Sequence, residues 1–367
     1  MNTPVRIVVL GAGLIGKRHV EHIAAEPAAE LSAVVDPSPA GEAVAREHGV
    51  TWYPNFAAIP AAERPEGVIV ATPNQLHVAN GRECVAAGVP CLIEKPIADN
   101  VASATELVEA AEAAGVPLLV GHHRRHNRML QTAKRAIEDG RLGRVLAVHG
   151  FCWFFKPDDY FDVPWRREKG AGPVFLNLIH DVDNLRYLFG DVVSVQALES
   201  NAVRGHPVEE TAVILLRFAS GVLGTVSVSD AIVAPWSWEL TAGENPAYQQ
   251  TDQACYHIGG TEGSLTVPYL DLWRNAGRRS WWEPVVPERL PYTYEDPLRL
   301  QVRQFCRVIR GLEAPLVSGR EGLETLRVIE AVKQSAATGQ MIRLERHSCD
   351  SPVGTPVKPE QCATSGI

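Results

Sequence analysis

Short apolar runs alternate with helix-like patterns through the first third of the chain. Between the runs, apolar residues recur at a helical spacing, so that Ile15, Val20 and Ile23 fall on one face. The runs themselves are typical of buried strands and occupy residues 5–10, 31–35, 67–71, 90–94 and 117–120. Strands that alternate with helices of this length predict an α/β fold, with a parallel sheet and helices on both of its faces.

The rhythm changes after about residue 121. Helical patterns at 124–138 and 175–188 flank a strand at 145–155, strands follow one another over 192–269, and helical patterns return at 297–310 and 322–337. We therefore expect an N-terminal α/β domain at 1–121 and a C-terminal α+β domain at 122–346 with a large, mostly antiparallel open sheet. Residues 347–367 are rich in Ser, Pro, Thr and Gly, which predicts a flexible tail.

Composition excludes several classes of protein. The 367 residues are 46% hydrophobic and 21% charged with a net charge of −8, so the basic excess typical of nucleic-acid-binding proteins is absent. The seven cysteines form no Cys-x-x-Cys pair, which argues against a disulfide framework or a zinc site. No apolar run approaches the ~18–20 residues of a membrane span, and no signal peptide precedes the first strand. We expect a cytoplasmic protein without metal, nucleic-acid or membrane partners.

A glycine motif joins the first apolar run to the helix that follows it. Gly11-Ala12-Gly13-Leu14-Ile15-Gly16 matches Gly-x-Gly-x-x-Gly in the strand–turn–helix context of dinucleotide-binding proteins. The first glycine allows the tight turn, the second lets the backbone approach a pyrophosphate, and the third allows close packing of helix on strand. The free N–H groups at the start of the helix attract the anion. We predict a Rossmann domain whose cofactor contacts are Gly11, Gly13, Leu14, Ile15 and Gly16.

An aspartate closes the second strand. Asp36 lies 20 positions after Gly16, where a carboxylate accepts hydrogen bonds from the adenosine ribose hydroxyls and repels a 2′-phosphate. Pro37 follows it, rather than an arginine that could hold a phosphate. The sequence therefore predicts NAD as the cofactor and makes NADP less favoured.

Polar residues follow two further strands at the same edge of the sheet. Thr72, Asn74 and His77 come after the third apolar run, and Glu94 and Lys95 end the fourth. Because open parallel sheets bind ligands outside the carboxyl ends of their strands, we expect all five residues near the cofactor. A lysine there can hydrogen-bond the substrate oxygen whose charge changes during hydride transfer. The spacing alone is equally consistent with a His77 that only packs in the core and with a Lys95 that is exposed to solvent.

Three downstream motifs complete a family pattern. Gly170-Ala171-Gly172, His180 with Asp183, and Gly260-Thr261-Glu262-Gly263-Ser264 follow the glycine motif, Asp36, Ala71-Thr72-Pro73-Asn74 and Glu94-Lys95-Pro96. Over about residues 4–345 the chain thus resembles the glucose–fructose oxidoreductase / inositol dehydrogenase family (Gfo/Idh/MocA). The resemblance implies a Rossmann domain, an α/β domain whose open sheet often mediates dimers or tetramers, an active site between the domains, and Lys95 as the active-site lysine.

The chain departs from the family pattern at one position. Family members usually carry an aspartate four residues before the histidine that matches His180, and that position here is Leu176. His180 is therefore the leading acid/base candidate, because imidazole exchanges protons near neutral pH, although many such histidines are simply core residues. Asn177 shares a helix face with His180 and is a substrate-binding candidate. Asp183, one turn later, is expected to orient His180 or to contact substrate.

Further substrate-binding candidates lie elsewhere in the second domain. Arg124 begins that domain at the cleft edge, and Trp165 and Arg166 precede the Gly170 loop, where family members often bind substrate. Trp236-Ser237-Trp238 and Glu244-Asn245-Pro246 sit among the strands. Aromatic faces stack on sugar rings, and arginine forks bind hydroxyls or carboxylates. For each of these residues, packing or a solvated surface is the alternative.

The motifs and the resemblance together predict an NAD-dependent oxidoreductase. It would transfer hydride between nicotinamide and a hydroxyl-bearing carbon of a sugar, cyclitol or sugar acid, and the expected partners are this small polyhydroxylated substrate and one or three further copies of the chain. One alternative is a cis-dihydrodiol dehydrogenase of aromatic catabolism. The other is a protein with a resident NAD, used for transient oxidation during hydrolysis or epimerisation, or for redox sensing.

Overall fold

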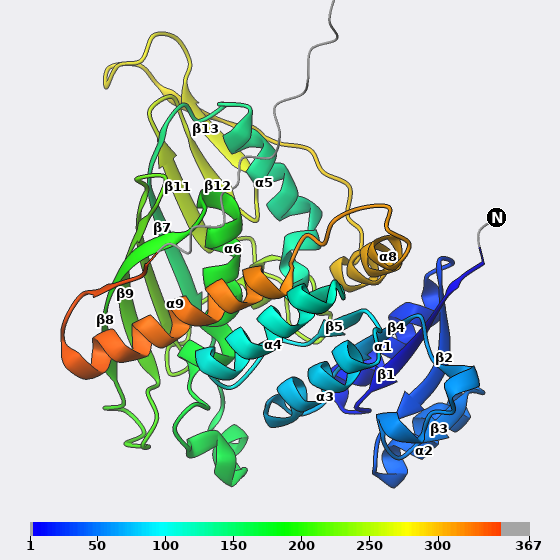
Figure 1. Ribbon diagram of the computed structural model, residues 1–367. Coiled ribbons are helices and arrows are strands. Elements are labelled where there is room, and N and C mark those ends of the chain that lie inside the picture. Colours follow the sequence, from blue (N-terminus) through cyan, green and yellow to red (C-terminus); the bar gives the residue numbers. More distant parts are fainter. Residues whose placement is uncertain (1–2, 346–367) are drawn as a thin grey trace, which may run out of the picture.

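The chain folds around two β-sheets that lie side by side (Figure 1). The computed structural model describes residues 3–345, so the tail predicted at 347–367 lies outside the described residues. The α/β architecture and the large second sheet predicted from the sequence are both confirmed.

The first sheet has six strands, all parallel, in the order β3-β2-β1-β4-β5-β6. Helices alternate with these strands, as predicted. The elements are β1 (Val5–Leu10), α1 (Leu14–Ala25), β2 (Ala29–Val35), α2 (Pro39–Glu47), β3 (Thr51–Tyr53), β4 (Gly67–Val70), α3 (Asn74–Ala86), β5 (Cys91–Ile93), α4 (Val101–Ala114) and β6 (Leu118–Val120). The strand order reverses between β1 and β4, which is where doubly wound sheets bind their ligands.

Two C-terminal helices return to this first sheet. Val302 and Phe305 of α8 (Pro297–Ile309) are buried in the same core as β1. The longer α9 (Gly319–Thr338) contributes Leu323 to the core beside β5 and β6, and Ile329 to the core of the second sheet. The two halves of the molecule therefore share helices that were predicted to belong to the second domain alone.

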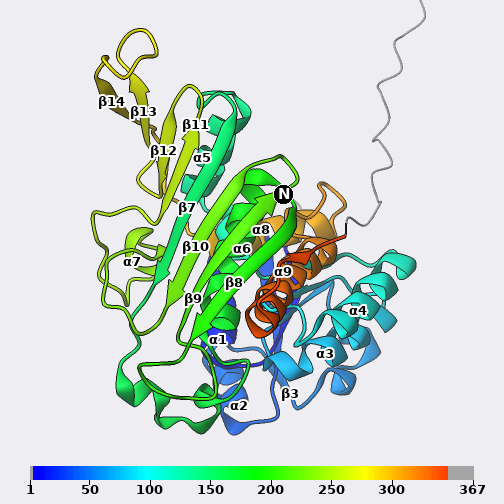
Figure 2. The same cartoon turned by 90° about the vertical axis from the view of Figure 1, so that its left-hand side faces the viewer.

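The second sheet has nine strands in the order β14-β13-β12-β11-β7-β10-β9-β8-β15. Its paired strands are antiparallel except β7 and β10. Helices α5 (Arg128–Glu138), α6 (Ile179–Phe189) and α9 pack on one face, and Figure 2 shows the opposite face without a helix over it among the described residues. The strands are β7 (Val145–Trp153), β8 (Val192–Ser200), β9 (Thr211–Phe218), β10 (Leu223–Ser229), β11 (Tyr256–Gly260), β12 (Ser264–Val267), β13 (Asp271–Asn275), β14 (Val285–Arg289) and β15 (Ile342–Arg343).

Local structure differs from the sequence prediction in two helical segments. The stretch predicted as one helix at 175–188 begins with a π-helical turn, Val174–Leu178, before α6. The stretch predicted at 124–138 breaks at Asn127, whose side chain accepts a hydrogen bond from the Met129 N–H at 2.8 Å and so caps α5. A short 3-10 helix, His123–His126, precedes that cap.

Two further observations concern the cysteines and the helices. The five described cysteines are buried, and none of them forms a disulfide. Within residues 3–345, no helix combines the length and the apolar character needed to span a bilayer.

Candidate active site

The glycine loop between β1 and α1 has the geometry of a dinucleotide site. Gly11 has φ +94°, and a Cβ there would lie 2.5 Å from the carbonyl oxygen of Ala71 at the end of β4. A Cβ on Gly16 would clash with the carbonyl oxygen of Gly11. A Cβ on Gly13, by contrast, would meet no heavy atom within 4 Å. Gly11 and Gly16 are thus required by the fold, whereas Gly13 borders open space that a bound pyrophosphate would fill.

The start of α1 supplies donors to that space. Gly13 is the N-cap residue and no side chain caps the helix there, and Leu14 is 91% exposed. Uncapped N–H groups and the positive end of the helix dipole attract a phosphate anion. The residues present therefore fit the pyrophosphate of NAD.

Asp36 is fixed to the glycine loop. Its Oδ2 accepts a hydrogen bond from the Ala12 N–H at 2.7 Å, and its Oδ1 accepts bonds from the N–H and the hydroxyl of Ser38. Burial opposes ionisation, but the bonds from Ser38 and Ala12 lower the pKa of Asp36 below its ordinary value. The side chain is therefore an oriented carboxylate, as the prediction of a ribose contact requires.

His77 corrects one sequence prediction. The ring is 1% exposed, with Nδ1 2.7 Å from the carbonyl oxygen of Pro96 and Nε2 2.8 Å from that of Thr72. Both nitrogens are engaged, so the ring has no free polar atom for a cofactor. His77 instead ties the loop after β4 to the loop after β5. Thr72 and Asn74 lie at the carboxyl end of β4 and remain predicted cofactor contacts.

Glu94 also faces inward. One carboxylate oxygen lies 2.7 Å from Nε2 of His19 on α1, and the other accepts the Lys95 N–H at 3.2 Å. Burial raises the pKa of Glu94, but His19 outweighs that effect and brings it to about 2. A Cβ on Gly121 would lie 2.9 Å from this carboxylate, so the glycine leaves room for it. Glu94 therefore orients the backbone at Lys95, and its own oxygens are not free for a cofactor, contrary to the sequence prediction.

Lys95 points toward the second domain. Its Nζ donates a hydrogen bond at 3.2 Å to the carbonyl oxygen of Leu176 in the π-helical turn. Burial lowers the pKa of Lys95, Glu94 and Glu239 oppose that change, and the positive charge of Arg124 adds to it. Leu176, which stands where the resemblance predicts an aspartate, thus contacts Lys95 through its main chain.

His180 lies on the first turn of α6, beside the loop that follows β6. It is 8% exposed, and its ring centroid lies 5.6 Å from that of His123 and 6.2 Å from that of His122. Burial, together with the positive charges of Lys95 and Arg124, holds the pKa of His180 well below its ordinary range. The imidazole is therefore neutral at pH 7 and able to accept a proton.

Asp183 corrects a third prediction, its contact with substrate. Arg125 binds it with both arms of the guanidinium, from Nε to Oδ2 at 2.9 Å and from Nη2 to Oδ1 at 2.7 Å. The Thr325 hydroxyl also donates to Oδ1, at 3.0 Å. The carboxylate is buried and occupied from both sides, so it does not contact substrate.

Arg124 is the centre of a charged cluster in the second domain. The guanidinium lies 2.7 Å from Oε1 of Glu239 and 3.7 Å from Oδ2 of Asp181, and packs over the Trp238 ring at 5.5 Å. Burial raises the pKa of Asp181 to about 6, even though Arg124 favours its ionised form. Tyr256 donates a hydrogen bond to the other oxygen of Asp181.

A cleft of about 130 Å³ adjoins this cluster, between the two halves of the molecule. Arg18 of α1 and Leu298 of α8 line one side, and His123, Arg124 and Glu239 line the other. The cleft therefore joins the dinucleotide-binding domain to the Arg124 cluster, which is the position that an active site between the domains requires.

Trp165 and Arg166 are not among the residues that line this cleft. They lie on a 3-10 helix between β7 and the π-helical turn. Arg166 donates to the carbonyl oxygen of Tyr160 at 2.8 Å and packs over the Tyr160 ring at 4.1 Å. Its charge is thus engaged within its own segment, and its predicted substrate contact remains a prediction.

Sequence reasoning missed several residues of the site. Glu239 and His123 line the cleft, and Asp181 contacts Arg124, yet none was singled out as a site residue. Only their positions in the sequence could have pointed to these residues. His123 directly precedes the candidate Arg124, and Glu239 directly follows the candidate run Trp236-Ser237-Trp238.

Comparisons with known proteins agree with this geometry. Residues 5–122 match the model of the oxidoreductase family with an NAD-binding Rossmann fold, and residues 130–266 match the GFO/IDH/MocA C-terminal domain. D-apiose dehydrogenase of Paraburkholderia graminis is 28% identical over 95% of this chain and 92% of that protein. The scyllo-inositol 2-dehydrogenase (NAD(+)) of Bacillus subtilis is 25% identical over 94% of this chain and 98% of that protein.

A solved structure extends the likeness to the whole fold. The WlbA dehydrogenase from Bordetella pertussis, in complex with NADH and UDP-GlcNAcA, is 27% identical, with a TM-score of 0.76 over 94% of this chain and 100% of that one. Both family models, the glycine loop with its oriented Asp36 and the lysine after β5 lead to one conclusion. The chain belongs to the Gfo/Idh/MocA family of oxidoreductases and carries its NAD-binding Rossmann domain.

Proposed function

We propose that the chain is an NAD-dependent dehydrogenase that oxidises a secondary hydroxyl of a neutral sugar or cyclitol. The observation that carries this proposal is a group of buried polar atoms in and beside the cleft that have no hydrogen-bond partner among the described residues. They are Nε of Arg124 and Oε2 of Glu239, which line the cleft, and Oδ1 of Asn177 in the π-helical turn that contacts Lys95. This group contains both hydrogen-bond donors and acceptors. It therefore suits the vicinal hydroxyl groups of a polyol, each of which can donate and accept a hydrogen bond.

The charge balance favours a neutral substrate over a sugar acid. Glu239 and Asp181 contact Arg124, and together with Glu244 they raise its pKa above the ordinary value despite burial. The guanidinium is thus neutralised by carboxylates, and a substrate carboxylate brought to it would meet Glu239 at close range. Hydroxyl groups carry no such penalty.

Two side chains handle the proton and the developing charge. The neutral His180 accepts the hydroxyl proton, and the ammonium of Lys95 donates a hydrogen bond to the substrate oxygen as that oxygen becomes a carbonyl. NAD, when bound, accepts the hydride from the same carbon. His180 is buried and Lys95 is half-buried, so partial exclusion of water strengthens both interactions.

The test is NADH formation with matched pairs of substrates. We expect turnover with one or more of the panel glucose, galactose, xylose and inositol, and at least 100-fold lower kcat/KM with glucuronate and galacturonate. In Glu239→Gln, which frees the charge of Arg124, the ratio of acid to neutral turnover should rise about tenfold. Equal or better turnover of the acids by the unaltered protein would contradict the neutral class. Tight NAD binding without turnover of any polyol would contradict the dehydrogenase.

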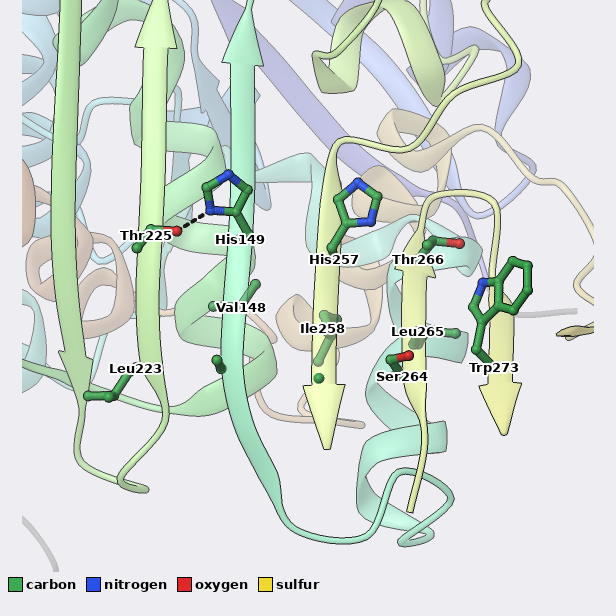
Figure 3. Close-up of a pocket in the computed structure, with 12 residues that line it drawn as sticks. Val148, His149, Leu223, Thr225, His257, Ile258, Ser264, Leu265, Thr266 and Trp273 are labelled. Atoms are coloured by element: carbon green, nitrogen blue, oxygen red, sulfur yellow. Dashed lines mark hydrogen bonds between the residues drawn. The ribbon is translucent and has the colours of Figure 1, made fainter. Parts of the chain in front are cut away.

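We further propose that the chain assembles as a homodimer or homotetramer through the uncovered face of the nine-stranded sheet. Outward residues of β9 include Val213 and Leu215, both more than half exposed, and Leu198 of the paired β8 is 71% exposed. Figure 3 shows Leu223, Thr225 and neighbouring side chains around a hollow of about 540 Å³ on this same face. Solvated sheet faces normally present polar residues, so the exposed side chains of Leu198, Val213, Leu215 and Leu223 on this uncovered face support burial against a second copy.

The oligomer is tested by molar mass in solution. The unaltered protein should have two or four times the mass of one chain by light scattering, and Val213→Lys with Leu215→Lys should reduce it to one. Leu312→Lys, at an exposed leucine away from the sheet, is the matched control and should leave the mass unchanged. A monomeric unaltered protein would contradict the proposal.

The free cysteines also support work in a reducing compartment such as the cytoplasm.

A further inference from the structure

Two buried histidines lie next to each other behind the cleft. His122 follows β6 and is 1% exposed, and its ring meets that of His180 edge to face, with centroids 6.2 Å apart. Within the described residues, neither nitrogen of His122 has a hydrogen-bond partner, and neither does Nδ1 of His180. Buried polar atoms are costly when unpaired, so these three nitrogens must be satisfied within the same small space.

Asp183 sets the state of the first ring. Its Oδ2 lies 4.0 Å from Nδ1 of His122, and the carboxylate is held in place by Arg125 and Thr325. Burial opposes ionisation of Asp183, but the charge and the hydrogen bonds of Arg125 hold its pKa below the ordinary value. An ionised carboxylate only accepts hydrogen bonds. The ring nitrogen that faces it, Nδ1 of His122, therefore carries the hydrogen.

Each imidazole has only one hydrogen to place. Burial lowers the pKa of His122 to about 4 and that of His180 well below its ordinary range, so both rings are neutral at pH 7. With its hydrogen on Nδ1, His122 presents Nε2 as an acceptor. A hydrogen-bond relay that runs from Asp183 through His122 to His180 then requires the hydrogen of His180 on Nδ1, which leaves Nε2 of His180 as a free lone pair.

The free nitrogen is the useful one. Nδ1 of His180 is fully buried, so the small exposed part of the polar ring edge is at Nε2, the nitrogen that a substrate hydroxyl can reach. We propose that His122, held by Asp183, is a positioning residue that fixes His180 in the tautomer able to accept the substrate proton. This inference rests on the proposed function, in which His180 is the proton acceptor. It explains how the chain works with Leu176 in place of a carboxylate.

No direct hydrogen bond joins the two rings among the described residues, so the proposed relay includes one water that donates to Nε2 of His122 and accepts from Nδ1 of His180. During oxidation, the O–H bond of the substrate breaks, its proton forms a bond to Nε2 of His180, and the hydride leaves for NAD. The hydrogen on Nδ1 does not move. The other charged or titratable groups that act on the two rings are Lys95, Arg124, His123, Arg125 and Glu94.

The most direct test is nitrogen-15 NMR of histidine-labelled protein bound to NAD. His180, assigned by its loss in His180→Gln, should carry its hydrogen on Nδ1 in the unaltered protein. In His122→Phe it should shift to Nε2 or to a mixture of tautomers. His126→Phe is the matched control, since His126 is a buried, neutral histidine of the same loop. A hydrogen on Nε2 of His180 in the unaltered protein would overturn the proposal, as would an unchanged tautomer in His122→Phe.

Kinetics supply the second readout. His122→Phe should lower kcat roughly 10- to 100-fold, as loss of an orienting partner does elsewhere. KM should stay within twofold, the acid limb of the kcat profile should move to lower pH, and His122→Gln should recover part of the rate. If the profile of His122→Phe matches that of His126→Phe, the positioning role is wrong. If instead His180→Gln keeps full turnover, the proposed function is wrong, whatever the tautomer of His180.

Discussion

Replacing Gly13 by alanine should separate cofactor binding from folding. Gly13 has φ −71°, which alanine adopts freely, and an added Cβ would meet no heavy atom within 4 Å. Alanine restricts the unfolded chain, which stabilises the fold by about 0.4–1 kcal/mol. Alanine is also a poorer N-cap than glycine, which costs a similar amount. The free energy of unfolding should therefore change by less than about 0.5 kcal/mol.

Binding should respond quite differently. The added methyl group would occupy the space beside the uncapped start of α1, where the pyrophosphate of NAD must lie. Overpacking of a fitted site by one methyl group costs about 1–3 kcal/mol. This corresponds to a Kd for NAD that is about 5- to 150-fold higher.

The assay pairs an NAD titration by calorimetry with thermal melts recorded without NAD, because bound ligand would raise Tm by itself. Gly16→Ala is the matched control: its Cβ would clash with the carbonyl oxygen of Gly11, so both Tm and NAD affinity should fall. If Gly13→Ala binds NAD as tightly as the unaltered protein, the pyrophosphate does not approach Gly13. If it melts as early as Gly16→Ala, the space beside Gly13 is not open.

Three further predictions concern charged residues. Asp36→Ala should weaken NAD binding about tenfold or more, since it removes hydrogen bonds to a charged acceptor. In parallel titrations with NADP, the preference of the protein for NAD should become smaller. An unchanged ratio of the two Kd values would contradict the ribose contact. The pKa of Glu94 is lowered from 4.5 to about 2, so its stabilisation is complete above pH 4.5 and disappears as the pH falls toward 2. Between pH 4.5 and pH 2, the Tm of Glu94→Gln should therefore fall less than the Tm of the unaltered protein. If the two proteins lose Tm in parallel over this interval, Glu94 is not the ionised partner of His19. Arg125→Met should lower the free energy of unfolding in urea by about 3–5 kcal/mol because it leaves Asp183 buried and unpaired, whereas Arg46→Met, which breaks an exposed pair, should change it by less than about 1 kcal/mol.

The sequence was most informative where a single segment determines its own structure. Strands of a parallel sheet are buried on both faces, so β1 and β4 appear as continuous apolar runs. The edge strand β14 is exposed along its whole length and contains Pro287, which removes the usual strand signal. The apolar stripe of α8 indicates a buried face, but periodicity does not identify the sheet that buries it.

Side-chain direction was the least predictable property of the site. Asp183 was expected to orient His180 or to contact substrate, but its direct partners Arg125 and Thr325 lie 58 and 142 residues away in the chain. His77 was placed at the right sheet edge, yet the carbonyl oxygen of Pro96 turns its ring inward. Position along a strand follows from the sequence, whereas the orientation of a polar side chain depends on partners that only the fold brings together.

We propose that Lys95 and the NAD site act together in oxidising a neutral polyol. The most direct measurement is the rate of NADH formation by Lys95→Met, with the best substrate of the panel and with NAD affinity measured on the same sample. We expect a kcat about 100- to 1,000-fold below that of the unaltered protein, the usual cost of losing a donor to the reacting oxygen. The Kd for NAD should stay within threefold of the unaltered value. Turnover by Lys95→Met within threefold of the unaltered rate would contradict the proposal.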